Sequence, residues 1–246
     1  MIFGVYRMLS PKKEWKTSSG KFPLKWRDIL KARVDFYNFL DKAGKISFEK
    51  RVQEFILNYR ITGVETAVDD TDKVLVAASA IIPVFQFPDW RYDNLDEVML
   101  YPSGFNEQFE TSGADRNILG MVGTGYMEGK MVLSKAALHH GFSNRTDKRN
   151  TAVHEFVHLI DKSDGNTDGI PAALLDKQYA VPWIDLIYRK IDEIKDGESD
   201  INPYGATNKA EFFAVAGEYF FERPKVLRDK HPELYNMMNE MFVKRN

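Results

Sequence analysis

The chain has 246 residues, of which 43% are hydrophobic, and this length can bury one large core or two small ones. It contains no cysteine, which excludes disulfide bonds, thiolate metal sites and a cysteine nucleophile. Its net charge is −2, with Lys and Arg interspersed among Asp and Glu, which argues against nucleic acid as a partner.

The N-terminus is apolar over residues 1–9 but too short to span a bilayer. It has no basic region ahead of it and no clear cleavage site, so it is a poor signal peptide. We expect a segment that packs or stays loose, and the remnant of a longer membrane anchor is the alternative. The longest uncharged apolar run, residues 74–87, is also too short for a span. Because the absence of cysteine is typical of a reducing compartment, the sequence favours a cytoplasmic protein.

The chain is expected to form an irregular lead-in over residues 1–24 and a single domain over residues 25–246. Apolar side chains at helical spacing predict a first helix from Lys25 to about Ala43. A second helix is predicted to begin at Ser47, as the N-cap, and to end near Arg60.

The next predicted elements are a short strand over residues 61–65 and a buried helix from Val74 to Ile82. The acidic residues 69–72 suit the N-terminus of that helix, where the helix dipole stabilises negative charge. Pro83 is expected to end it.

Two further strands are predicted, at Val98–Tyr101 and Met131–Ser134. Residues 104–129 contain six glycines and little periodicity, and we expect a long ordered loop or a hairpin there. Helices are predicted over the remaining apolar patterns, around residues 151–161, 183–194, 208–221 and 232–243. The expected fold is therefore α+β and mostly helical, with a small sheet beside the first of these four helices.

The strongest chemical signal is the run from His154 to His158, which has the spacing His-Glu-x-x-His. Histidines four residues apart lie on one face of a helix, so both imidazoles can bind one zinc ion. Glu155 would lie beside the metal, where it can take a proton from a zinc-activated water. The neighbouring positions are apolar, as in a helix buried under a cleft. A surface helix with a chance histidine pair is the alternative.

A catalytic zinc usually has three protein ligands, and three carboxylates are candidates for the third. For Asp164 to bind the metal, the chain would have to turn sharply after His158, but no glycine occurs between His158 and Gly165. Glu211 and Glu218 lie seven residues apart in an otherwise almost apolar helix, where a carboxylate is costly unless it is paired or bound to a metal. We predict Glu211 as the ligand and Glu218 as the acceptor of a histidine N–H. The alternative is that both face solvent or a basic partner.

Two more polar residues are candidates for supporting roles. Tyr204 lies in the loop that enters the Glu211 helix, and its hydroxyl could donate to an oxyanion near the zinc. Asp161 shares a helical face with His154 and His158, where it could orient an imidazole or cap the following loop. For each, an ordinary structural role is the alternative.

These features together resemble the Mlc titration factor A family of zinc peptidases. The resemblance covers roughly residues 45–240 and rests on the following segments: His154–Asp161, Gly165, Gly169–Pro171, Tyr204, Ala210–Val215 and Glu218–Phe221, with Glu97–Pro102 and Val132–Ser134 upstream. The His-Glu-x-x-His motif alone is shared by many proteases, and its combination with Tyr204 and the Ala210–Phe221 helix is more specific.

The resemblance implies a gluzincin domain similar to the protease domain of anthrax lethal factor. It implies one zinc ion on His154, His158 and Glu211, with Glu155 as general base and Tyr204 as a transition-state donor. Where the lethal-factor-like pattern has a second acidic residue four positions after the ligand glutamate, this chain has Val215.

The sequence thus predicts a zinc metallopeptidase that acts on peptide or protein substrates. The strand at Met131–Ser134 is expected to be a sheet edge that pairs with an extended peptide. The competing hypothesis is a non-catalytic or latent zinc protein that binds a regulatory protein partner through its cleft. Hydrolysis of a non-peptide amide is a second alternative, because the motif does not set the leaving group.

Overall fold

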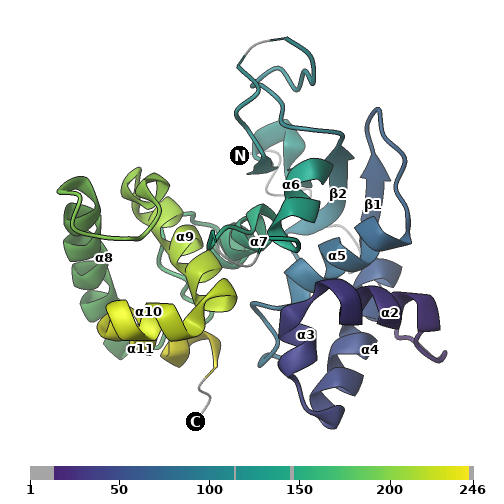
Figure 1. Cartoon of the computed structure of the whole chain (residues 1–246), viewed down its shortest axis with the longest axis horizontal. Helices are drawn as coiled ribbons and strands as arrows, with labels where there is room; N and C mark the ends of the chain where they lie inside the picture. The colour runs from purple at the N-terminus through teal and green to yellow at the C-terminus, as the bar shows by residue number, and fades with distance from the viewer. Residues whose placement is uncertain (1–13, 114, 145–146, 244–246) are drawn as a thin grey trace.

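The computed structural model describes residues 14–113, 115–144 and 147–243. The apolar segment of residues 1–9 lies outside these ranges. Residues 14–23 contain no helix or strand, and the first described helix begins at Leu24. In Figure 1, helix α7 lies between two halves of the molecule, one containing α2–α5 and the sheet and the other containing α8–α11. The predicted class, mostly helical α+β with a small sheet, is confirmed.

The N-terminal half contains α2 (Leu24–Arg33), α3 (Asp35–Phe39), α4 (Lys42–Asn58) and α5 (Asp70–Ile81). The single helix predicted over residues 25–43 is wrong, because the backbone of Val34 is extended and its side chain enters the core. The N-cap predicted at Ser47 is also wrong, because the Asp41 side chain accepts the Gly44 N–H and starts α4 earlier. The predicted acidic start of α5 is confirmed as a capping box between Asp69 and Asp72.

The sheet has the order β1-β2-β4-β3. Its strands are β1 (Arg60–Gly63), β2 (Leu95–Tyr101), β3 (Gly120–Val122) and β4 (Gly129–Ser134). Strands β1, β2 and β4 run parallel to one another, and β3 is antiparallel to β4. The prediction that the Met131–Ser134 strand is an edge is therefore wrong, since it pairs on both sides. The edge beside it is β3, a three-residue strand inside the segment predicted as a loop or hairpin.

The remaining α-helices are α6 (Lys135–Gly141), α7 (Thr151–Asp161), α8 (Ala180–Lys195), α9 (Lys209–Glu222), α10 (Pro224–Lys230) and α11 (Pro232–Phe242). Short 3₁₀ turns occur at 125–127, 162–164, 177–179 and 203–206. Of these elements, α6 and α10 were not expected from periodicity, because seven residues hold too few turns to show an apolar stripe.

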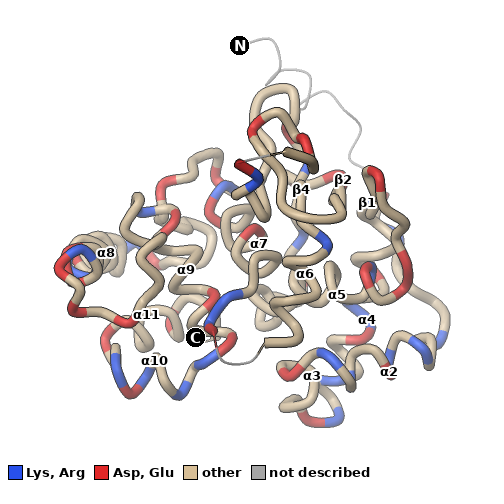
Figure 2. The backbone as a smooth tube through the Cα atoms, turned by 45° about the horizontal axis from the view of Figure 1, so that its top comes forward, with Lys and Arg blue, Asp and Glu red and all other residues tan. Residues whose placement is uncertain are grey.

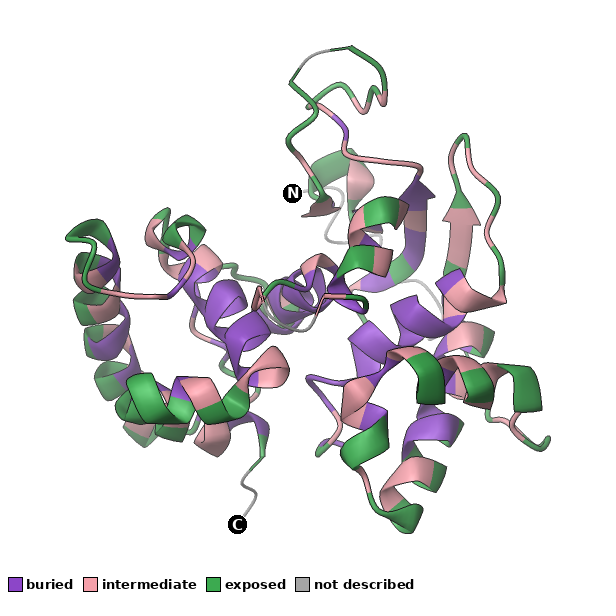
Figure 3. Ribbon diagram, viewed as in Figure 1, coloured by how far each residue is buried: buried purple, intermediate pink, exposed green. Residues whose placement is uncertain are grey.

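One hydrophobic core extends through both halves, from Leu30 to Phe242. Figure 3 shows α5, α7 and α9 as its most continuously buried helices. A smaller cluster around Tyr101, Phe105 and Val132 lies apart from that core. Acidic and basic residues are interspersed over both halves of the backbone in Figure 2. Among the described residues, no helix is both long and apolar enough to cross a membrane.

Candidate metal centre

Helix α7 carries the His-Glu-x-x-His motif in a buried position. Its N-cap is Asn150, whose side chain accepts the Val153 N–H. His154 and His158 are each 8% exposed and Glu155 is 5% exposed. Polar side chains at this depth are costly unless they are paired or bind an ion. The alternative of a surface helix with a chance histidine pair is therefore excluded by burial.

Three donor atoms from α7 and α9 form a small triangle. His154 Nε2 lies 3.0 Å from Glu211 Oε2, His158 Nε2 lies 3.3 Å from the same oxygen, and the two nitrogens are 3.1 Å apart. Ligands at 2.0–2.1 Å from a tetrahedral zinc lie about 3.3 Å from one another. The triangle thus fits a metal ion with three protein ligands and one open position.

The charges around this triangle favour a cation at its centre. Burial opposes a charged His154, but hydrogen bonds with Glu211 and Glu218 raise the pKa of His154 to about 10. Burial also opposes an ionised Glu211, yet its contacts with His154 and His158 lower the pKa of Glu211 to about 2. A site that binds a proton so firmly between carboxylates also stabilises a metal cation.

Glu218 contacts His154 at Nδ1, the ring nitrogen that is not part of the donor triangle. Its Oε1 lies 2.8 Å from His154 Nδ1, and its Oε2 accepts the backbone N–H of Asn150 at 2.6 Å. The Asn150 side chain in turn donates to Glu222 at 3.0 Å. A hydrogen bond to Nδ1 leaves Nε2 available to a metal. Glu218 is therefore placed to orient the imidazole of His154. Through its bond to Asn150, it also connects α9 to the N-terminus of α7.

Asp161 contacts the following loop and not an imidazole. Its Oδ2 accepts the Gly169 N–H at 2.8 Å, and the Gly169 carbonyl accepts Trp183 Nε1–H at 2.7 Å. Gly169 has a φ of +78°, and a Cβ there would lie 2.3 Å from the Lys209 carbonyl oxygen. The end of α7 is thereby connected, through a position that requires glycine, to the first turn of α9, which carries Glu211.

The carboxylate of Glu155 faces strand β3. A Cβ built on Gly120 would lie 2.6 Å from Glu155 Oε1 and 2.7 Å from its Cγ. Burial raises the pKa of Glu155 above its ordinary value. Gly120 was missed from the sequence because it is one of six glycines in a segment without periodicity.

Tyr204 lies near His154, in the turn Pro203–Ala206. Its ring centroid is 6.0 Å from that of His154, and the residue is 54% exposed. Partial burial and the negative charges of Glu211 and Glu155 raise the pKa of Tyr204, so its hydroxyl keeps its proton.

Asp164, the other candidate for the third ligand, is exposed and accepts the Asn166 N–H, and it is not part of the donor group.

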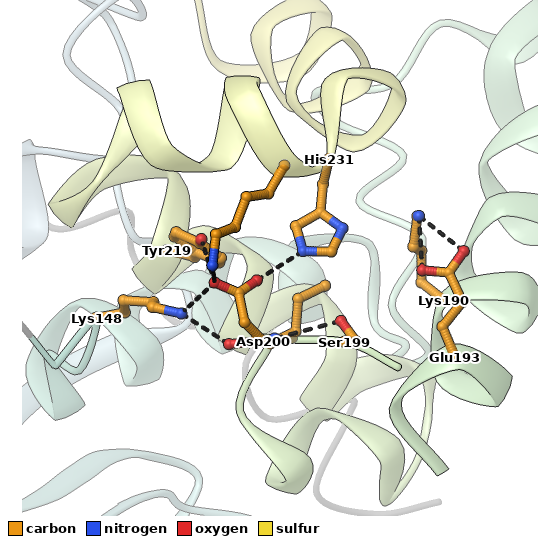
Figure 4. A network of polar contacts seen from close by, with 9 residues as sticks. Lys148, Lys190, Glu193, Ser199, Asp200, Tyr219 and His231 are labelled. Carbon is orange, nitrogen blue, oxygen red and sulfur yellow. Dashed lines mark hydrogen bonds and ion pairs between the residues drawn. The ribbon is translucent and has the colours of Figure 1, made fainter. Parts of the chain in front are cut away.

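A polar network centred on Asp200 connects the segment before α7 with α9 and with the C-terminal helices (Figure 4). Asp200 Oδ2 accepts from Lys148 and Lys230 at 2.8 Å each and from Tyr219 at 3.0 Å, and its Oδ1 lies 2.8 Å from His231 Nε2. Lys148 lies two residues before the N-cap of α7, and Asp200 lies four residues before Tyr204. Despite burial, these contacts hold the pKa of Asp200 well below its usual range.

Asp200→Asn is expected to destabilise the fold by about 2–3 kcal/mol at pH 7, because charge-assisted hydrogen bonds are lost. Since the folded-state pKa of Asp200 is depressed, its contribution is present above the unfolded pKa of about 4 and declines as the pH falls below it. Urea unfolding at pH 7 and in acid measures both effects. Asp176→Asn, at an exposed position, is the control and should change little; equal stability of wild type and Asp200→Asn at pH 7 would contradict the assignment.

Comparison with known proteins identifies relatives over nearly the whole chain. The family model described as glucose-regulated metallo-peptidase M90 matches residues 9–243. An uncharacterized protein of Synechocystis sp. is 26% identical over 231 residues, which is 89% of this chain and 84% of that protein. Mlc titration factor A of Pectobacterium atrosepticum is 27% identical over 192 residues, covering 72% of this chain and 70% of the relative. Mlc titration factor A of Escherichia fergusonii is 26% identical over 230 residues, covering 88% and 84%.

Proposed function

This chain belongs to the glucose-regulated metallopeptidase M90 family, and we propose that it is a zinc-dependent enzyme that hydrolyses peptide bonds. The resemblance to Mlc titration factor A is confirmed by the named relatives. The observation that carries the proposal is the triangle of His154, His158 and Glu211 donor atoms, with the buried Glu155 near enough for its carboxylate to interact electrostatically with all three. A purely structural metal site has no use for that carboxylate.

The proposed chemistry divides among residues whose positions are given above. A bound zinc ion would supply a Lewis acid that activates water and polarises a carbonyl. Glu155 takes the proton of the attacking water and later delivers it to the leaving amine. Tyr204 donates a hydrogen bond to the oxyanion of the tetrahedral intermediate. Glu218 holds His154 in the tautomer that leaves Nε2 available for the metal.

Metal removal tests this proposal directly. Treatment with a chelator is expected to abolish cleavage of a peptide library, and about one equivalent of zinc per chain should restore it. Product formation can be followed by mass spectrometry, with magnesium as the control ion. Cleavage that survives complete removal of the metal would contradict a metal-dependent reaction.

Strand β3 is the proposed site of peptide pairing, in place of the strand at Met131–Ser134. Leu119 and Gly123 bond to Ser134 and Lys130 of β4. Because antiparallel pairing alternates along a strand, the N–H and C=O groups of Gly120 and Val122 point away from β4. Gly120 also adjoins Glu155. An extended substrate paired with this edge would thus pass beside the general base.

Val122→Pro tests this pairing, because proline removes an outward N–H without removing a bond to β4. We expect KM for an extended peptide to rise several-fold with zinc content unchanged. Lys130→Gln on β4, at a position whose side chain bonds Glu97, is a control for general disturbance of the sheet. An unchanged KM in folded Val122→Pro would show that peptides bind elsewhere.

The competing proposal is a latent or non-catalytic zinc protein that binds a regulatory protein partner. It draws support from relatives whose name, Mlc titration factor A, describes titration of another protein. The presence of Glu155 near the donor triangle favours catalysis. Hydrolysis of a non-peptide amide uses the same groups, and a panel of amide substrates separates it from peptidase activity. Because the chain has no cysteine, the cytoplasm is the location that we propose.

A further inference from the structure

A cavity lies beside α4, and none of its lining residues belongs to the donor triangle. Its volume is about 180 Å³, and it is bordered by α4, by residues 88–92 and by the lead-in around Trp15. Two of its walls, Phe55 and Tyr92, pack against Phe156 with ring centroids 5.7 and 5.2 Å apart. Phe156 is two residues from both His154 and His158, so it projects from a different face of α7. The cavity is therefore separate from the metal centre.

Arg51 is the unusual feature of this cavity. It is 8% exposed, and no carboxylate of the described residues lies within ion-pair distance of its guanidinium. Its Nη1 donates to the carbonyls of Val84 and Phe85 at 2.8 and 2.9 Å. Its Nη2 is buried and has no hydrogen-bond partner among the described residues. Burial lowers the pKa of Arg51, and the carboxylates of Glu54 and Asp89 oppose this only through longer-range attraction. A buried cation without a carboxylate in direct contact is costly.

A second donor borders the same cavity and also lacks a partner. Trp90 Nε1–H is buried without a hydrogen bond to any described residue. Lys50 and Arg91 add positive charge to the lining, and Glu54 and Asp89 add negative charge. Glu54 lies 3.9 Å from Lys50, and Arg91 stacks on Trp15 at 4.6 Å. Among the described residues of this lining, Arg51 Nη2 and Trp90 Nε1 are the buried donors that lack acceptors.

We propose that this cavity binds a small oxyanion, a phosphate or a carboxylate, between Arg51 and Trp90. A guanidinium pairs with an oxyanion through charge-assisted hydrogen bonds, and an indole N–H adds a neutral donor. The volume equals that of about six water molecules at roughly 30 Å³ each, which suffices for an ion of four or five heavy atoms. The anion supplies a counter-charge in direct contact with Arg51, which Glu54 and Asp89 do not provide at ion-pair distance.

The test is thermal unfolding of the full chain, with phosphate, acetate and chloride compared at equal ionic strength. We expect phosphate or acetate, and not chloride, to raise the melting temperature in a saturable way. Which of the two does so identifies the oxyanion. Trp90→Phe keeps most of the ring and removes the donor, and it should weaken the apparent affinity about tenfold. Trp26→Phe, on α2 outside the cavity, should leave the affinity unchanged.

Because an anion could also reach a metal ion at the donor triangle, the Trp90→Phe comparison assigns the effect to the cavity. Arg51→Met, if it folds, should abolish the saturable effect. Equal affinity in wild type and Trp90→Phe, or no saturable effect of either oxyanion, would overturn the proposal. Arg51 would then serve only to bind the carbonyls that follow α5.

Discussion

Glu211→Gln is expected to abolish stoichiometric zinc binding while the fold is kept. The change preserves size but replaces an anionic oxygen, 3.0 and 3.3 Å from the two imidazole nitrogens, with a neutral amide. Loss of a supporting residue alone typically costs 10–100-fold in metal affinity, so loss of a direct ligand should cost more than about 100-fold. Zinc per chain after dialysis against a competing chelator measures the effect.

Two comparisons make this result decisive. Glu233→Gln, on the surface beside Arg189, is the matched control and should keep one zinc per chain. Asp164→Asn should also keep it, because Asp164 lies outside the donor group. Wild-type zinc affinity in Glu211→Gln together with loss in Asp164→Asn would transfer the third ligand to Asp164, the alternative that the sequence left open.

Gly120→Ala is expected to lower kcat/KM by about 100-fold without loss of zinc. The new methyl group would lie 2.6 Å from Glu155 Oε1 and 2.9 Å from its Cδ, so the carboxylate or strand β3 must move. A displacement of about 1 Å at a reacting group commonly costs about 100-fold in rate. Steady-state kinetics on one peptide, with metal content measured in parallel, separates this effect from loss of the ion.

The control for this change is Gly20→Ala, because a Cβ at Gly20 meets nothing within 4 Å. It should retain wild-type kcat/KM. If Gly120→Ala also retained wild-type kcat/KM, the contact between β3 and Glu155 would not matter for activity. The proposed route of the substrate along β3 would then lose its main support.

The sequence predicted the parts of the site that depend on helical periodicity. Histidines four residues apart and glutamates seven apart lie on fixed faces of a helix, so α7 and α9 and their inward residues followed directly. The pairing of Glu211 with both imidazoles required only that these two helices pack together, which they do. The similarity to the lethal-factor protease domain stays a prediction.

Features that depend on long-range packing were missed or wrong. Periodicity does not encode strand order, so β4 was predicted as an edge although β3 pairs with it. A three-residue strand that begins with Gly120 carries no alternating pattern. The contact of Glu218 with Asn150 joins segments that are far apart in the chain, and no local signal marks it. For Asp161, the contact with the following loop is one of the two roles predicted, and the sequence did not decide between them.

The most direct test of the account is zinc content and peptide cleavage of wild type beside Glu155→Gln. Glu155 lies beside the donor triangle and is not one of its three donors. We therefore expect both proteins to bind about one zinc, and we expect the variant to lose cleavage by about 100-fold or more. Equal cleavage by both would contradict the role of Glu155 as general base. Zinc in both proteins with no cleavage by either would favour the latent or regulatory function, and no zinc in either would refute the metal centre itself.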